Sequence, residues 1–243
     1  MAGLGQRFRD AGYSLPKPLI PVDGEPMVVR VVRDLPAAER IVFIVHPEHV
    51  AQFAIDRVLR DKLPQAEIVI APGLTEGQAC SVRLGTHLLD PRDEVIVAAC
   101  DNTHRYQLDQ LRRQTATKDV DCLIWTYRGV PRVLENPHWY GWVQTNAAGD
   151  VTNVSVKKPI SATPLADHVV SGTFWFRSAE ILANGIDALV ASNIRVNNEF
   201  YLDAVPNLLR DQGRRSQVFE VDEYIGWGTP ADLVAYEAAR AAA

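Results

Sequence analysis

Three short apolar runs constrain the fold of this chain more than any other feature. They are IVFIVH at 41–46, AEIVIA at 66–71 and EVIVAA at 94–99, and each is rich in β-branched residues. The stretches between them carry apolar residues at helical spacing. Strands that alternate with helices in this way form a parallel sheet covered by helices, so we expect an α/β protein with a Rossmann-like, mostly parallel sheet and helices on both faces.

The sequence pattern changes after about residue 120. In the first half we expect helices near 27–35, 47–62, 78–89 and 108–117. The second half predicts strands at 120–128 and 169–177, a β-hairpin over 140–156 around the turn AAGD, helices near 178–191 and 199–212, a last strand at 216–221 and a helix from Pro230. Because no linker or repeat separates the halves, we predict a single domain over 1–243, with a first half of about 1–118 and a hairpin-containing extension of about 119–243.

Composition narrows the class of protein. The 243 residues hold 25 Lys and Arg against 30 Asp and Glu, a net charge of -5, and no basic run, which argues against a nucleic-acid partner. No segment approaches the roughly 20 apolar residues that span a bilayer, so we expect no membrane partner. Cys80, Cys100 and Cys122 are few, odd in number and widely spaced, which indicates reduced core thiols and a cytoplasmic protein.

A glycine-rich basic segment opens the chain. In Gly3-Leu4-Gly5-Gln6-Arg7-Phe8 the glycines let backbone N–H groups approach phosphate oxygens, and Arg7 supplies a bidentate cation. Lys17 follows in PKPLIPVDGEPM, where two prolines stiffen the loop that presents its ammonium. Together they predict a polyphosphate site; taken singly, the glycines are also typical of a flexible loop and each cation of a solvated surface charge.

The two segments in this order resemble the signature of the sugar-phosphate nucleotidylyltransferases, G-x-G-x-R-(F/L/M) followed by P-K-x-(L/M)-x-P. Further resemblances follow in the family's order along nearly the whole chain. They are TEGQACSVRLG at 75–85, VAACDN at 97–102, VSVKKP at 154–159, SGTFWFR at 171–177, NNEFYLDAVPNLL at 197–209 and GWGTPADL at 226–233.

The resemblance implies a fold and a set of roles. The fold is that of nucleotide-diphospho-sugar transferases, with a nucleotide-binding half and then an acceptor-binding half. Arg7, Lys17 and Asp101 would be catalytic, and Asp101 would hold Mg²⁺ at the end of a strand, although an Asp there is also typical of a turn cap. The nucleotide would contact Gly3, Leu4, Gly5, Gly77, Gln78 and Cys80, and the acceptor would contact Lys158, Gly172 and Glu199.

Three positions depart from the family pattern. Lys157 replaces the glutamate of E-K-P, which suits an acceptor of higher negative charge or a side chain turned to solvent. Cys80 stands where many pyrimidine-nucleotide enzymes carry Gln, and the form of this loop resembles a capsule-associated subgroup and favours CTP. Gly226 replaces the second metal-binding aspartate, so Asp222 or Glu223, water, or Asp101 alone would complete the magnesium site.

These observations lead to one main hypothesis and two alternatives. We expect transfer of an NMP group from an NTP, CTP favoured, to a sugar 1-phosphate or related phosphorylated acceptor, with release of pyrophosphate, in capsule or surface-polymer synthesis. The alternatives are a nucleotide-binding regulatory subunit with impaired catalysis, and a GT-A-type glycosyltransferase, which Asp101-Asn102-Thr103 argues against because it lacks a D-x-D motif. Homo-oligomer formation stays open.

The chain begins at the glycine loop, whereas family members begin with a buried strand that leads into it. We therefore expect a native start upstream of Met1, or else a groove in the sheet, because an absent central strand would expose two rows of backbone groups.

Overall fold

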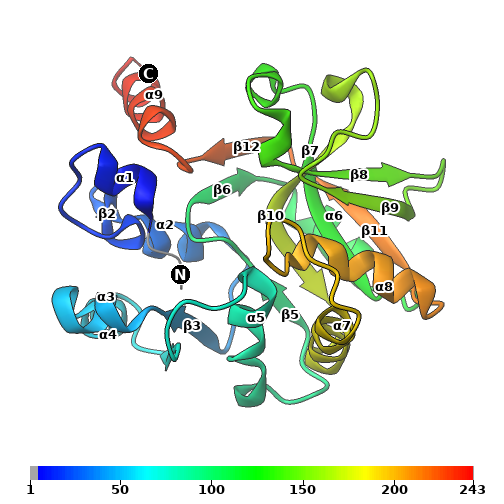
Figure 1. Cartoon of the computed structure of the whole chain (residues 1–243), viewed down its shortest axis with the longest axis horizontal. Coiled ribbons are helices and arrows are strands. Elements are labelled where there is room, and N and C mark those ends of the chain that lie inside the picture. Colours follow the sequence, from blue (N-terminus) through cyan, green and yellow to red (C-terminus); the bar gives the residue numbers. More distant parts are fainter. Residues whose placement is uncertain (1–4, 243) are drawn as a thin grey trace. The chain divides into compact units, whose positions relative to one another are not determined.

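The computed structural model describes residues 5–242, so Gly3 and Leu4 lie outside the described residues. The chain divides into two compact units. Figure 1 labels the helices and strands of both. Unit 1 comprises residues 1–75, 99–105 and 224–243, and unit 2 comprises residues 76–98 and 106–223. Each unit therefore draws on more than one stretch of the sequence.

Unit 1 holds the amino-terminal loops and the carboxyl-terminal helix. Its elements are α1 (Gln6–Asp10), the 3-10 turn η1 (Lys17–Leu19), β1 (Pro21–Val22), β2 (Glu25–Pro26), α2 (Met27–Asp34), β3 (Ile41–Val45), α3 (Pro47–Phe53), α4 (Ile55–Lys62), β4 (Ala66–Ile70), β6 (Asn102–Arg105), β12 (Glu223–Gly226) and α9 (Pro230–Ala241). β3 and β4 run parallel, from Ile41 opposite Ala66 to Val45 opposite Ile70, which confirms the parallel pairing expected of these two runs.

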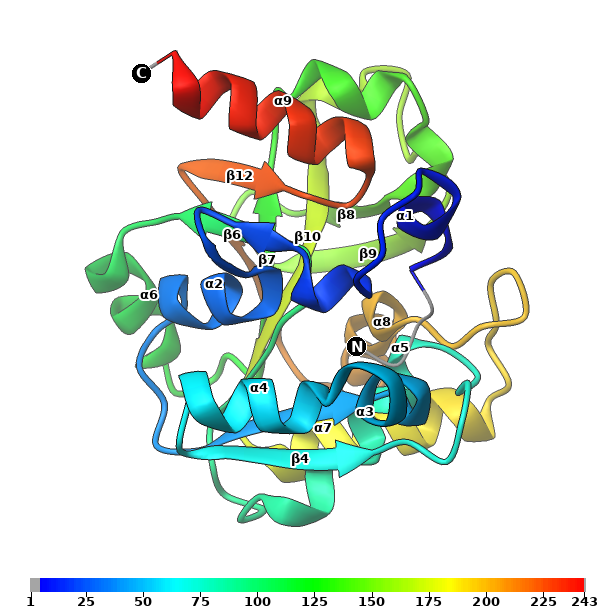
Figure 2. The same cartoon turned by 90° about the vertical axis from the view of Figure 1, so that its left-hand side faces the viewer.

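The helical segment after β3 is broken in two. Ala54 has a φ of 47°, and it separates α3 from α4 where a single helix over 47–62 was expected. Figure 2 shows α3 and α4 lying along β4. Ile55 and Leu59 of α4 are fully buried against Phe43 and Val45 of β3, so the break serves to turn an apolar face onto the sheet.

Unit 2 is built around a mixed six-stranded sheet. Its elements are α5 (Gln78–Arg83), η2 (Thr86–Leu88), β5 (Val95–Val97), α6 (Leu108–Thr115), β7 (Cys122–Tyr127), η3 (Pro131–Leu134), η4 (Pro137–Trp139), β8 (Gly141–Thr145), β9 (Val151–Val156), η5 (Pro164–Ala166), β10 (His168–Phe176), α7 (Ala179–Ala191), η6 (Leu202–Ala204), α8 (Val205–Asp211) and β11 (Ser216–Glu220). The strand order is β11-β7-β10-β8-β9, with β5 also paired to β10.

Within the part of the chain that the structure describes, β11–β7 is the one parallel pair of this sheet. The pairs β7–β10, β10–β8, β8–β9 and β5–β10 are antiparallel. The α/β class expected from the sequence is confirmed, with less parallel pairing than the first half of the chain predicts. One reason is the expected hairpin, since β8 and β9 return through a short turn, which only antiparallel strands can do. The other is the run at 94–99, which was expected in the parallel sheet but forms β5 and pairs antiparallel with β10.

The helices of unit 2 pack on this sheet. α7 and α8 lie side by side in Figure 1, and their apolar residues join the sheet in one core that includes Phe174, Phe176, Leu182, Ile186 and Leu209. Ser178 caps α7 by accepting a hydrogen bond from the Ile181 amide at 3.2 Å. The segment expected as a helix over 199–212 is helical only from residue 202, because the backbone of Phe200 bonds to another loop.

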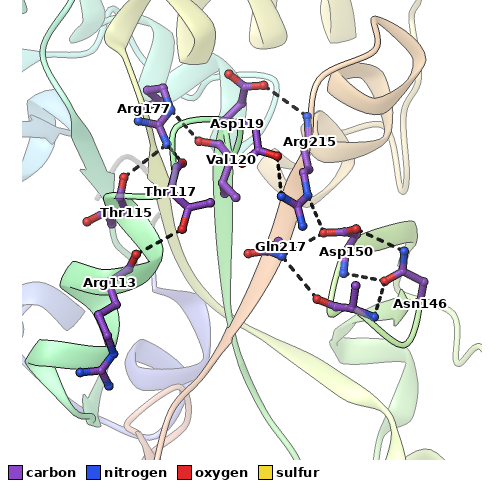
Figure 3. Close-up of polar contacts among 12 residues, drawn as sticks. Arg113, Thr115, Thr117, Asp119, Val120, Asn146, Asp150, Arg177, Arg215 and Gln217 are labelled. Carbon is purple, nitrogen blue, oxygen red and sulfur yellow. Dashed lines mark hydrogen bonds and ion pairs between the residues drawn. The ribbon is translucent and has the colours of Figure 1, made fainter.

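A polar network fixes the β8–β9 hairpin to the sheet (Figure 3). The Arg215 guanidinium lies 2.7 Å from Asp150 at the hairpin turn and 2.7 Å from Asp119. Gln217 also donates to Asp150, at 2.9 Å. Nearby, Arg177 donates to backbone carbonyls of Thr115, Thr117 and Val120. Each guanidinium thus joins segments that are far apart in the sequence.

The three cysteines are free thiols, as expected. Burial is the largest cause of the raised pKa of Cys80, Cys100 and Cys122, so all three favour the inert protonated form. Among the described residues, no helix combines the length and the apolar character needed to cross a membrane.

Candidate active site

In unit 1 the glycine loop and the lysine loop touch. Gly5 adopts the left-handed conformation, with φ 64°, directly before α1. A Cβ placed on Gly5 would lie 3.1 Å from the Lys17 Cβ, so glycine is what allows the two loops to approach this closely. Phe8 anchors the first loop by being buried, with the Lys17 ammonium 5.4 Å from its ring centroid. Arg7 lies on the exposed side of α1.

Lys17 and Asp101 form an ion pair. The Lys17 Nζ donates to Asp101 Oδ2 and also to the Gly228 carbonyl, the latter at 3.0 Å. The two side chains are only 15% and 26% exposed, so this pair is less screened by water than a surface ion pair. Two residues that the sequence nominated as catalytic are therefore in direct contact.

Backbone bonds place the Asp101 carboxylate. Asp101 lies just before β6, which pairs with β12, and its carbonyl accepts a hydrogen bond from the Trp227 amide at 2.7 Å. The following turn brings Gly228 close, since a Cβ on Gly228 would lie 3.9 Å from Asp101 Oδ2. Sequence reasoning did not single out Gly228, although it lies within the GWGTPADL stretch.

Gly226 carries no carboxylate, and the neighbouring Tyr224 ring leaves little room for a side chain at this position. A Cβ on Gly226 would lie 2.9 Å from the Tyr224 ring, so the phenol fills the space next to this position. Asp222, an alternative ligand, accepts a hydrogen bond from Gln107 at 2.7 Å. Within residues 5–242, no group of three or more His, Cys, Asp or Glu side chains converges to hold a metal ion. Asp101 itself lies beside Lys17, among the expected phosphate-binding residues of unit 1.

In unit 2, residues 76–85 of the predicted nucleotide loop meet a predicted acceptor residue. Gly77 has φ 119°, and a Cβ there would lie 2.6 Å from both the amide nitrogen and the carbonyl oxygen of Phe200. It would also lie 3.1 Å from the Glu199 Cβ. Gly77 and Glu199, which are far apart in the sequence, are thus neighbours, and Gln78 and Cys80 follow in α5.

Lys157 points toward aromatic and polar partners in unit 2. Its Nζ donates to the Trp139 carbonyl and lies 5.4 Å from the centroid of the Tyr201 ring. Asp203 is close enough for Lys157 to oppose the rise in its pKa, which burial nevertheless brings to about 6. The Lys157 side chain thus has partners at Trp139 and Tyr201, and the acceptor of higher negative charge stays a prediction.

A close approach at Gly141 admits Asp203. A Cβ on Gly141 would lie only 2.2 Å from Asp203 Oδ2, so the carboxylate rests against a strand that has no side chain there. Sequence reasoning did not nominate Asp203 or Gly141. A glycine directly after two aromatic residues at a strand start was the available signal.

Lys158 and Gly172 have separate surroundings. The Lys158 side chain is exposed, and its carbonyl accepts a hydrogen bond from Ser155 Oγ at 2.7 Å. Gly172 has φ 90° and lies at the irregularity between Val170 and Phe174 in the β10–β7 register. The role in acceptor binding that both were expected to share with Glu199 stays a prediction.

Comparison with protein families decides the relationship. The model of the MobA-like NTP transferase domain matches residues 1–220. The chain belongs to this family. A MobA-like NTP transferase domain is a nucleotidyltransferase domain, so the resemblance found in the motifs is confirmed.

Individual proteins with sequences similar to this MobA-like domain include bifunctional GlmU proteins. The bifunctional protein GlmU of Burkholderia ambifaria is 28% identical over 244 residues, and that of Shouchella clausii 27% identical over 243 residues. These alignments cover 97% and 99% of the chain but 50% of each relative, so the chain spans about half the length of these relatives.

Solved structures support the fold. A nucleoside-diphosphate-sugar pyrophosphorylase from Vibrio cholerae RC9 superposes with a TM-score of 0.74 at 21% identity and covers 97% of both chains. An inositol-1-phosphate CTP transferase from T. maritima superposes with a TM-score of 0.73 at 16% identity, covering 97% of this chain and 91% of that one. The expected nucleotide-sugar transferase fold is confirmed.

Proposed function

We propose that this protein transfers an NMP group from an NTP to a sugar 1-phosphate or a related phosphorylated acceptor. An oxygen of the acceptor phosphate attacks the α-phosphorus, a new P–O bond forms, and the bond to the β-phosphate breaks to release pyrophosphate. The nucleophile is already an anion, so no covalent enzyme intermediate is needed. Catalysis then consists mainly of positioning the reactants and neutralising charge.

The contact of Gly5, Lys17 and Asp101 carries this proposal. Lys17 is held at the edge of the glycine loop, where its ammonium can contact an α-phosphate and the leaving group. Gly3, Gly5 and Arg7 would bind the β- and γ-phosphates from the same loop, and Leu4 would contact the nucleotide. A triphosphate that enters would compete with Asp101 for the Lys17 ammonium, because both present anionic oxygens to one cation.

Asp101 would hold Mg²⁺ as a single carboxylate, since it belongs to no group of three or more metal-ligating side chains within residues 5–242. This hard ion prefers oxygen ligands and is commonly held by one or two carboxylates together with water and substrate phosphates. Asp101 offers such a carboxylate, and the backbone bond from Trp227 fixes its position. When bound, the ion would neutralise charge on the phosphates. Lys17 would then exchange its carboxylate partner for a phosphate oxygen.

The acceptor and the base are the finer parts of the proposal. Glu199, Lys158 and Gly172 would contact the acceptor, and the Lys157 ammonium adds positive charge that favours a strongly anionic one. Gln78, Cys80 and Gly77 would face the base. CTP is our preferred donor, supported by the form of this loop and by the likeness to the inositol-1-phosphate CTP transferase from T. maritima. A role in capsule or surface-polymer synthesis is proposed on the motif resemblance alone, and a location in the cytoplasm on the few, widely spaced cysteines.

A second candidate is a nucleotide-binding regulatory subunit with impaired catalysis. The observation that favours it is Gly226, where the Tyr224 ring fills the space next to the backbone and the side-chain carboxylate of the family pattern is missing. A GT-A-type glycosyltransferase is less well supported, because the sequence after Asp101 is Asn-Thr.

Pyrophosphate release distinguishes these functions. The protein is incubated with Mg²⁺, each common NTP, and glucose 1-phosphate or inositol 1-phosphate. We expect release with at least one pair, and CTP as the best donor. Arg7→Ala and Asp101→Ala should each lower turnover by about a hundredfold or more, because Arg7 would neutralise phosphate charge directly and Asp101 would hold the Mg²⁺ that does so. Asp61→Asn, at an exposed acid on α4, is the control and should retain full activity.

Nucleotide binding without pyrophosphate release across this panel would favour the regulatory subunit. Unchanged turnover in both Arg7→Ala and Asp101→Ala would contradict the assigned roles.

A further inference from the structure

The segment 193–201 of unit 2 is a tight loop that presents Glu199. Asn193, Asn197 and Asn198 all have positive φ angles, of 49°, 50° and 63°. Within the loop, Val196 and Glu199 exchange two backbone hydrogen bonds of 3.0 Å each. Such a turn has little freedom to change locally, so a displacement of Glu199 requires the loop to move as a body.

Backbone bonds tie this loop to the predicted nucleotide loop. The Phe200 amide donates to the Glu76 carbonyl at 2.7 Å, and the Phe200 carbonyl accepts from the Ala79 amide at 3.0 Å. Gly77 lies between these two bonds, pressed against the Phe200 backbone. The two bonds set Glu199 directly beside the residues expected to face the base.

The Arg195 side chain links segment 193–201 to the 75–85 loop. The Arg195 guanidinium lies 2.9 Å from Glu76 Oε1 and 4.0 Å from the centroid of the fully buried Phe200 ring. It also donates to Asn193 Oδ1 at 2.7 Å and to the Asn198 carbonyl at 3.1 Å. Glu76 is 63% exposed, so water screens the ion pair, which can supply only part of the link between the two loops. The stacking on Phe200 and the two bonds within the loop make Arg195 a fixed bridge between the loops.

We propose that Arg195 is a positioning residue that holds Glu199 against the 75–85 loop and thereby couples nucleotide binding to acceptor binding. The inference rests on the proposed function, since it takes Gly77 and Gln78 as nucleotide contacts and Glu199 as an acceptor contact. A nucleotide that orders the 75–85 loop would order Glu199 at the same time, so the acceptor would bind an already ordered site. By linkage, the acceptor tightens nucleotide binding by the same factor.

The test measures this coupling directly. Calorimetry gives the affinity for inositol 1-phosphate and glucose 1-phosphate with and without the non-reactive analogue α,β-methylene-CTP. In the wild-type protein we expect the analogue to tighten acceptor binding by about tenfold, within the usual range of coupling between sites. We call the acceptor Kd without the analogue divided by the Kd with it the coupling ratio. In Arg195→Ala this ratio should fall below about twofold. The acceptor KM should rise by about the factor by which the ratio falls, with kcat nearly unchanged.

Arg214→Ala is the matched control. Arg214 also pairs with an acid in unit 2, Asp121 at 3.2 Å, but it precedes β11 and belongs to neither loop. It should keep the wild-type ratio. Glu76→Gln removes only the ion pair and should give an intermediate ratio, which keeps the inference testable if Arg195→Ala does not fold.

The outcomes separate the two proposals. Wild-type protein that binds neither the analogue nor an acceptor would overturn the proposed function and this inference with it. Binding of both, with a ratio near one in the wild type or an unchanged ratio in Arg195→Ala and Glu76→Gln, would overturn the inference and leave the proposed function standing.

Discussion

At the scale of single residues, glycines permit the contacts on which both candidate sites depend. Gly5 admits Lys17, Gly77 admits the Phe200 backbone, and Gly141 admits the Asp203 carboxylate. In each case a methyl group would occupy space that a neighbouring atom already fills. The absence of a side chain is therefore what matters at all three glycines. Backbone freedom matters in addition at Gly5 and Gly77, where φ is positive.

Gly77→Ala should be among the most damaging single substitutions in unit 2. The new Cβ would meet two backbone atoms at 2.6 Å, and alanine disfavours a φ of 119°. We expect the free energy of unfolding, measured by urea denaturation, to fall by about 3 kcal/mol. Gly213→Ala is the control: Gly213 has φ 77° with open space around it, so the loss should be about 1 kcal/mol. Equal losses in the two variants would show that the contact with Phe200 is unimportant.

At the scale of elements, the outer edge of β9 is completed by a side chain. β9 pairs with β8 on one side. On its other side, the Asn207 side-chain amide of α8 makes the two backbone hydrogen bonds that a neighbouring strand would make. Its Oδ1 accepts from the Val154 amide and its Nδ2 donates to the Val154 carbonyl, both at 2.8 Å. An edge strand covered in this way offers fewer open backbone groups for pairing with another chain.

Asn207→Ala should loosen this edge. The substitution leaves two backbone groups of the buried Val154 without their partner, at a cost of about 2 kcal/mol. Hydrogen exchange of the Val154 amide should accelerate, and urea denaturation should report the lost stability. Asn136→Ala, at an exposed position before η4, should change neither quantity. Unaltered exchange at Val154 in Asn207→Ala would mean that water replaces the amide without loss.

At the scale of the whole molecule, buried titratable groups set the response to acid. Burial lowers the pKa of His49 and of His104 to about 4, whereas burial raises the pKa of Asp203 to about 6. Between pH 6.5 and 4 the unfolded chain binds protons at both histidines that the native protein does not, so acid favours unfolding. Asp203 acts in the opposite sense, because its native form binds a proton below about pH 6 and its unfolded form only near 3.8.

We therefore expect the free energy of unfolding to fall as the pH is lowered from about 7 to about 5. His49→Leu should flatten this dependence, since it removes one proton that only the unfolded state binds. Asp203→Asn should make the dependence steeper, since it removes the opposing group. Denaturant titrations across this pH range measure all three slopes, and a wild-type slope that His49→Leu does not change would contradict the role given to His49.

Local patterns in the sequence predicted most strands and helices, but not where two of the helices break or begin. The runs at 41–46 and 66–71 are strands in the expected parallel pair, because β-branched residues in short apolar runs fit a buried sheet wherever it lies. The helix expected over 47–62 breaks at Ala54, and the one expected from 199 starts at 202. Alanine at φ 47° and the hydrogen bonds of Phe200 both depend on distant partners, which periodicity does not reveal.

The sequence by itself determined the class of the fold, the family and the identity of the phosphate-binding candidates, because apolar periodicity and the glycine, arginine and lysine motifs are local properties. Only the tertiary structure decided that Lys17 rests on Asp101 and Gly228, that Lys157 faces Tyr201, and that Arg195 pairs with Glu76. The partners in these contacts are far apart in the chain, and Lys17 and Gly228 are separated by 211 positions. Such proximity results from the packing of whole elements, which no local pattern records.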